Sequence, residues 1–223
     1  MRSGGLTLLR IGGIEIIIDY SWFIVFFLVV YTMAEGYFPR AHKDYTMMQY
    51  WTMGAVTALL LFVCVLIHEL AHSFVAIKQG IKVTSIRLLI FGGLAEISSE
   101  PQTGKHEFLI AISGPVASML LGMFCFAIYA YGQVAGFFPS VTAIAGVLGS
   151  ANIILALFNL IPGFPLDGGR ILRAILWDRW DDMARATKIV SRLGNGFAML
   201  LIIFGILQFF ITRRLISGLW FIF

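Results

Sequence analysis

The sequence predicts an all-α polytopic membrane protein with about six transmembrane helices and short β-hairpins on the cytoplasmic side. Its composition, its long apolar stretches and two glycine-interrupted β-branched segments support this prediction. Of the 223 residues, 59% are hydrophobic and only 13% are charged, and the mean hydropathy is +0.90. A soluble domain of this size carries about twice that charged fraction. We therefore expect one compact transmembrane domain spanning residues 1–223.

Five apolar stretches are long enough to cross about 30 Å of hydrocarbon. They lie at residues 20–34, 51–77, 108–131, 141–161 and 193–211. The first is short for a span, so we expect it to borrow residues from either side. A sixth stretch, LISGLWFIF from Leu215, is too short to cross the bilayer, which predicts an incomplete last helix.

Basic residues predict the orientation of the chain in the membrane. With a cytoplasmic N-terminus, twelve of the sixteen lysines and arginines fall in cytoplasmic segments, as the positive-inside rule requires. The net charge of +4 is modest, and the basic residues are scattered along the sequence. Nucleic-acid binding needs a clustered basic face, so that function is excluded.

Two kinds of non-helical segment interrupt the spans. LTLLRIGGIEIIID near the N-terminus and IKVTSIRLLIFGGLAEIS after the second span are rich in β-branched residues around paired glycines, which predicts β-hairpins. The segment NLIPGFPLDGGR, residues 159–170, breaks an apolar helix with prolines and glycines. Broken backbone at membrane depth is tolerated only where it is buried in protein or lines a watery cavity. The amphipathic stretch GRILRAILWDRW after it predicts an interfacial helix.

The second span contains the pattern HELAH. His68 and His72 are i, i+4 neighbours, a spacing at which two imidazoles can bind one metal ion. Glu69 lies beside them, placed to take a proton from metal-bound water. A solvated His/Glu face is disfavoured, because intramembrane ionisable groups are costly and usually functional. Cys64, one turn before His68, is at most a minor ligand.

A catalytic zinc needs a third protein ligand and an open position. Most other acidic side chains, Glu107 among them, lie in loops or near membrane boundaries, where we expect them to be solvated. Two acidic residues remain after this screening. We favour Asp167, in the broken segment after the fourth span, and keep Glu96, in the second predicted hairpin, as the alternative.

Four motifs together resemble the site-2 protease family of intramembrane zinc metalloproteases: HELAH, the Gly-Gly of IFGGLAEI, SGP at 113–115, and NLIPGFPLDGG. The resemblance covers nearly the whole chain in order. It implies that His68, His72 and Asp167 are the zinc ligands and that Glu69 is the general base or acid. Asn159 matches the asparagine of the family's NxxPxxPLDG motif, which implies a role in steadying the oxyanion or substrate.

Many members of that family carry a PDZ or CBS-pair domain, and this sequence contains neither. The incomplete last helix raises the expectation that a C-terminal regulatory domain has been removed. The segment SGP opens the third span, and we expect its small residues to serve helix packing.

The resulting hypothesis is regulated intramembrane proteolysis with one Zn²⁺ per chain. The substrate is a peptide bond in or near a transmembrane segment of another membrane protein, cut in the lipid bilayer near the cytoplasmic side. The hairpin at 84–97, with Gly92 and Gly93, is the candidate to receive the unwound substrate as an added strand, and the alternative is that it only covers the surface. The alternative reading is a membrane zinc transporter or a metal-binding scaffold.

Overall fold

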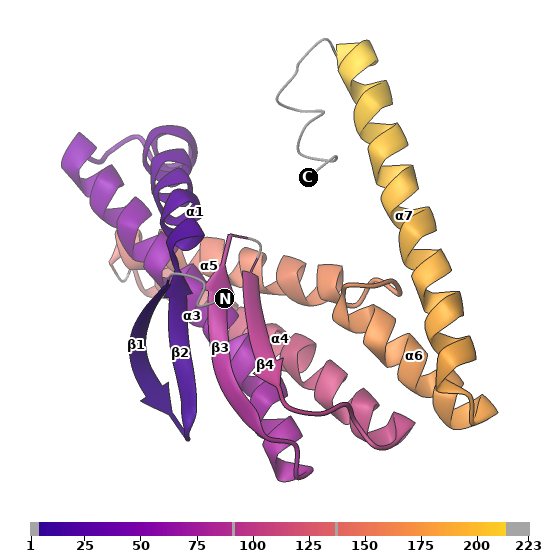
Figure 1. The fold of residues 1–223 in the computed structure, drawn as a ribbon. Helices are drawn as coiled ribbons and strands as arrows, with labels where there is room; N and C mark the ends of the chain where they lie inside the picture. The colour runs from indigo at the N-terminus through magenta and orange to yellow at the C-terminus, as the bar shows by residue number, and fades with distance from the viewer. Residues whose placement is uncertain (1–4, 91, 137, 213–223) are drawn as a thin grey trace. The chain divides into compact units, whose positions relative to one another are not determined.

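The computed structural model describes residues 5–90, 92–136 and 138–212. The elements follow one another in the order β1 (Gly5–Ile11), β2 (Ile14–Asp19), α1 (Tyr20–Tyr31), the π-helical segment η1 (Thr32–Tyr37), α2 (Phe38–Ala41), α3 (Met47–Lys78), β3 (Val83–Leu89), β4 (Gly92–Ile97), α4 (Gly104–Ala135), α5 (Pro139–Asn159), α6 (Asp167–Trp180) and α7 (Met183–Thr212) (Figure 1). Helices dominate, as predicted.

The described chain forms two compact units. The first comprises the described residues up to Pro101 together with Ile112–Leu157, and the second comprises Gln102–Ala111 and the described residues from Phe158 onward. The first unit therefore holds the strands, α1 to α3, most of α4 and most of α5. The second holds the first turns of α4, the loop before α6, and helices α6 and α7.

Five helices in the described residues are long and apolar enough to cross a membrane, which confirms the multi-pass prediction. The first is continuous from Tyr20 to Ala41 because η1 and α2 extend α1. Its 22 residues reach about 33 Å at 1.5 Å per residue. The short first span therefore borrows residues on its C-terminal side only. The apolar stretch from Leu215 lies outside the described residues.

The two predicted hairpins are present, but they join into one sheet with the order β1-β2-β3-β4 (Figure 1). β1 and β2 are antiparallel, as are β3 and β4, whereas β2 and β3 pair in parallel, with Ile16 opposite Ile86. The helices from α1 to α3 connect β2 to β3, and such a crossover is what a parallel pair requires. Both isoleucines are fully buried, so the shared apolar face explains the joining.

Close helix packing in the first unit depends on small residues. A Cβ on Gly54 of α3 would lie 2.9 Å from the carbonyl oxygen of Val30, and one on Gly132 of α4 would lie 2.1 Å from Thr142 Oγ1 of α5. Lipid tails are as apolar as the helices, so no hydrophobic driving force brings the helices together. Small residues at such crossings instead let the backbones approach closely enough for van der Waals packing. Many large apolar side chains on the spans, such as Phe124, are exposed and suit contact with lipid tails.

Candidate metal centre

The two histidines of the second span form a buried pair one helical turn apart on α3. His68 is 4% exposed and His72 is 5% exposed, and their Nε2 atoms lie 3.1 Å apart. Two nitrogens at that separation, each about 2.0–2.1 Å from a shared zinc ion, would subtend roughly 100° at the metal, which is close to tetrahedral. The pair therefore fits the binding of one metal ion.

A second helix, α4, presents Gly114 and Ser118 to this pair. Ser118 Oγ lies 2.9 Å from Nδ1 of His68, and Ser118 is fully buried. A Cβ on Gly114 would lie 2.2 Å from Nε2 of His72 and 2.6 Å from Nε2 of His68. From the sequence, SGP at 113–115 was expected to serve helix packing only, and the contacts of Gly114 and Ser118 with the histidines were missed. The i, i+4 spacing of residues 114 and 118 places them on one face of the helix, but the same spacing is typical of helix packing and does not indicate a contact with histidines.

Glu69 is half-buried and lies against the strand β4. A Cβ on Gly93 would lie 2.2 Å from Cγ and 2.7 Å from Cδ of Glu69, so only a glycine lets the strand pass this carboxylate so closely. Gly92, which starts β4, has φ +124°, a conformation that side chains other than glycine rarely adopt. The structure thus brings the predicted Gly-Gly pair to the predicted base.

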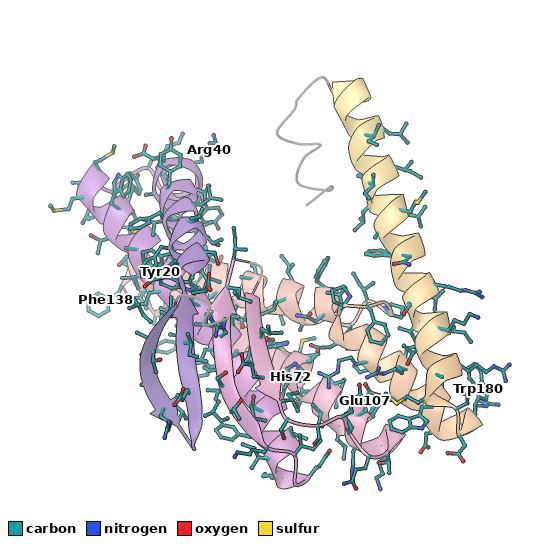
Figure 2. The ribbon with its side chains drawn as sticks, viewed as in Figure 1. Tyr20, Arg40, His72, Glu107, Phe138 and Trp180 are labelled. Atoms are coloured by element: carbon teal, nitrogen blue, oxygen red, sulfur yellow. The ribbon has the colours of Figure 1, made fainter. Side chains whose placement is uncertain are left out.

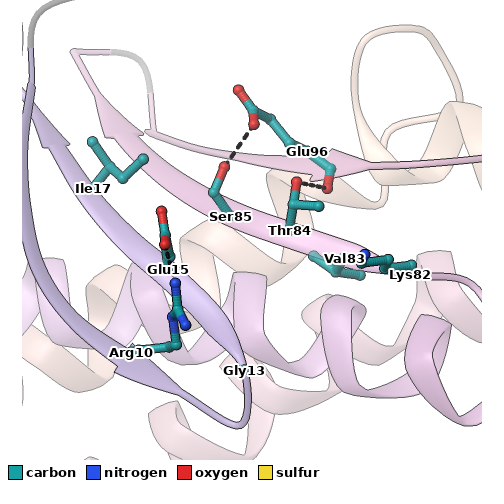
Figure 3. Close-up of a pocket in the computed structure, with 9 residues that line it drawn as sticks. All are labelled: Arg10, Gly13, Glu15, Ile17, Lys82, Val83, Thr84, Ser85 and Glu96. Atoms are coloured by element: carbon teal, nitrogen blue, oxygen red, sulfur yellow. Dashed lines mark hydrogen bonds and ion pairs between the residues drawn. The ribbon is translucent and has the colours of Figure 1, made fainter.

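Glu96 lies on the other face of β4. Side chains alternate along a strand, so Gly93 and Ala95 share the face that meets Glu69, whereas Glu96 points the opposite way. Its Oε2 accepts a hydrogen bond of 2.8 Å from Ser85 Oγ, and it lines a cleft of about 350 Å³ on the sheet (Figure 3). The structure therefore does not favour Glu96 as a metal ligand.

That cleft lies among paired charges. Arg10 and Glu15 form an exposed ion pair within it, and the other lining side chains come from β2, β3 and β4 and the turns beside them (Figure 3).

Among the described residues, no candidate metal-binding group includes Glu96 or Cys64.

Asp167 and Asn159 belong to the second unit, at the two ends of the loop that connects α5 to α6. Asp167 is the first residue of α6 and is 9% exposed. The chain doubles back between them, since a Cβ on Gly168 would lie 2.3 Å from the carbonyl oxygen of Leu160 and 2.4 Å from that of Ile161. The broken segment is therefore a compact turn that begins beside Asn159 and presents Asp167 at a helix N-terminus.

Glu107, also in the second unit, corrects one prediction. It was expected to be solvated, yet its side chain is fully buried. Both its carboxylate oxygens accept hydrogen bonds from Nε of Arg173, at 2.9 and 3.1 Å, and Arg170 lies 3.9 Å away. Arg173 also lies over the ring of Phe164, 5.2 Å from its centroid. This cluster fixes α6 and the preceding loop to the start of α4. Figure 2 labels Glu107 of this cluster.

Comparisons with known proteins agree on one family. The model of peptidase family M50 matches residues 56–144 and 135–202. The chain is 42% identical over 202 residues, 88% of its length, to sll0528 of Synechocystis, which is provisionally named a zinc metalloprotease. It is 39% identical over 164 residues, 73% of its length, to the zinc metalloprotease MJ0392 of Methanocaldococcus jannaschii.

A solved structure is similar as well. The site-2 protease from Methanocaldococcus jannaschii superposes with a TM-score of 0.61 and 33% sequence identity, covering 98% of this chain and 92% of that one. The chain spans about half the length of the curated relatives it matches, 52% of sll0528 and 46% of MJ0392.

Proposed function

The chain belongs to peptidase family M50, and from that premise we propose that it is an intramembrane zinc metalloprotease acting on membrane proteins. The resemblance to site-2 proteases deduced from its motifs is confirmed by the family match and by the solved structure. The observation that carries the proposal is the buried pair of imidazoles beside Glu69, with their Nε2 atoms 3.1 Å apart, in a helix long enough to span a membrane.

His68, His72 and Asp167 are the proposed zinc ligands. Each offers one donor atom, two imidazole nitrogens and one carboxylate oxygen, and this set leaves the open fourth position of a catalytic zinc site. The burial of all three supports the assignment, since ionisable groups buried in a membrane protein are usually functional. A zinc ion held there would supply Lewis-acid chemistry: it would lower the pKa of a coordinated water toward neutrality and polarise the scissile carbonyl.

Glu69 is the proposed general base. Its carboxylate takes a proton from the attacking water and then delivers that proton to the departing amine. The Asn159 amide is proposed to donate a hydrogen bond to the oxygen that becomes negatively charged in the transition state. Neither role requires Glu69 or Asn159 to bind the metal.

The strand β4 is the proposed substrate-binding edge. It is the terminal strand of the sheet in the described part of the chain, so one edge can pair with an added strand. A transmembrane helix hides its amides in internal hydrogen bonds and must unwind before a bond is cut. Gly92 and Gly93 would bind such an unwound segment, because β4 passes against Glu69 at Gly93.

The proposed location follows from the charges and spans. The five spans make this a multi-pass membrane protein. We place the N-terminus and the active-site side at the cytoplasm because the basic residues favour that orientation. The comparisons give no support to the zinc transporter or the metal-binding scaffold, since the relatives named above are zinc metalloproteases.

The test combines zinc content with cleavage of a reporter that carries one transmembrane segment, both in liposomes. We expect about one zinc per chain and cleavage by the unmodified protein, and for Glu69→Gln the same zinc content with no cleavage. Glu15→Gln, an exposed acid on the sheet, is the matched control and should cut normally. Cleavage by Glu69→Gln at the unmodified rate would refute the mechanism, and zinc movement across vesicles without cleavage would favour the transporter.

A further inference from the structure

We propose that Gly114 and Ser118 of α4 complete the histidine site as positioning residues. Gly114 keeps the space between the two Nε2 atoms free for the ion, and Ser118 holds the His68 ring so that its Nε2 faces that space. The inference rests on the proposed zinc chemistry and goes beyond it, because it assigns the wall of the site to a helix that supplies no ligand.

The space beside Gly114 borders both Nε2 atoms. A Cβ there would lie 2.2 Å from Nε2 and 2.6 Å from Cε1 of His72, and 2.6 Å from Nε2 of His68. A methyl group at 114 would therefore push the two rings away from the positions in which both nitrogens can bind one ion. Both rings are at least nine-tenths buried, which limits how far they can move away.

Another glycine of the same helix shows that this is not a general feature of α4. A Cβ on Gly122 would lie 2.7 Å from Cδ1 and 2.9 Å from Cγ1 of Ile153, and 3.2 Å from the carbonyl oxygen of Gly149. An alanine there would disturb the packing of α4 on α5 without touching a histidine. At Gly114 the atoms that meet the Cβ belong to the two histidine rings, the two proposed ligand nitrogens among them.

Ser118 acts on the other nitrogen of the first histidine. Its Oγ is 2.9 Å from Nδ1 of His68, and an Nδ1–H donated to this oxygen leaves the Nε2 lone pair for a metal. Metal-binding histidines generally donate their other N–H in this way, which fixes both the tautomer and the ring orientation. Ser118 is fully buried, so no bulk water competes for the bond.

A role in packing alone makes a different prediction. If Gly114 and Ser118 only allowed α3 and α4 to approach, their replacement would destabilise the metal-free and zinc-bound protein equally. Under our proposal the free energy of zinc binding falls far more than the stability of the metal-free protein, because the methyl group at 114 displaces the two rings that bind the ion.

The experiment measures zinc affinity of the full chain in detergent by competition with a chelator, together with the visible spectrum after cobalt substitution and the melting temperature without metal. We expect Gly114→Ala to weaken zinc binding at least about 100-fold and Ser118→Ala about 10- to 100-fold. Ser118→Thr, which keeps the hydroxyl, should recover much of the affinity and the cobalt spectrum. Gly122→Ala is the matched control and should bind zinc like the unmodified protein.

The outcomes distinguish a failure of the proposed function from a failure of the role proposed for α4. An unmodified protein that binds no zinc would refute the proposed function itself. If the unmodified protein binds zinc and Gly114→Ala or Ser118→Ala binds it equally tightly, only the role of α4 is refuted. Should Gly114→Ala fail to fold, the Ser118 pair of variants decides the question, and unchanged zinc affinity in Ser118→Ala overturns the proposal.

Discussion

Removal of the buried carboxylate at Glu107 should destabilise the second unit strongly. Glu107→Ala leaves Arg173 and Arg170, whose side chains are only 15% and 23% exposed, without their anion. Breaking a buried ion pair from one side costs about 3–5 kcal/mol, and we take the lower end because both guanidinium groups reach some water. A loss of about 3 kcal/mol corresponds to roughly a 150-fold shift in the opening equilibrium at 1.36 kcal/mol per tenfold change.

Hydrogen exchange of the α6 amides in detergent micelles is the suitable assay, because it reports the free energy of local opening. We expect the α6 amides to exchange about two orders of magnitude faster in Glu107→Ala. The double variant Glu107→Leu/Arg173→Met should recover part of this loss, since an apolar pair leaves a smaller uncompensated charge. Glu15→Ala, which breaks an exposed pair with Arg10, should change protection by less than about 1 kcal/mol. A Glu107→Ala effect that small would refute the reasoning.

Two further predictions concern the sheet and the start of α1. Gly93→Ala should greatly slow reporter cleavage while leaving zinc content unchanged, because the added Cβ would displace Glu69; normal cleavage would contradict the proposed strand position. The pKa of Asp19 is lowered from 3.8 by hydrogen bonds from the backbone and hydroxyl of Ser21 and by the charge of Arg87, against an opposing effect of burial. Asp19 therefore stabilises the fold fully above pH 3.8 and loses this effect as the pH falls through its lowered pKa. Asp19→Ala should lower the melting temperature at neutral pH, and the melting temperatures of the two proteins should converge in acid.

Several features of the fold were predictable from the sequence because they depend on local patterns. Span positions follow from runs of apolar residues, and the hairpins follow from β-branched segments around paired glycines. The parallel pairing of β2 with β3 was missed because it joins segments separated by three helices. An extension of the first span was expected, but its end at Ala41 was not, because Glu35 and Arg40 interrupt the apolar pattern.

The candidate site was likewise predictable only where a local sequence pattern marks the residues. His68, Glu69 and His72 stand out because charged groups in an apolar helix need an explanation. Gly114 does not stand out, because a glycine in a membrane helix normally indicates close packing and only coordinates show which atoms it approaches. Glu107 was misjudged because its partners lie more than sixty residues away in the chain, where no sequence pattern links them.

Zinc retention after replacement of the proposed third ligand tests the central claim most directly. The bound zinc per chain would be measured after dialysis against a chelator for Asp167→Ala, for Asp178→Ala in the same helix, and for Glu96→Ala. We predict that Asp167→Ala loses its zinc, whereas Asp178→Ala and Glu96→Ala keep about one ion per chain. Full zinc retention by Asp167→Ala, or its loss from Glu96→Ala alone, would contradict the proposed metal centre.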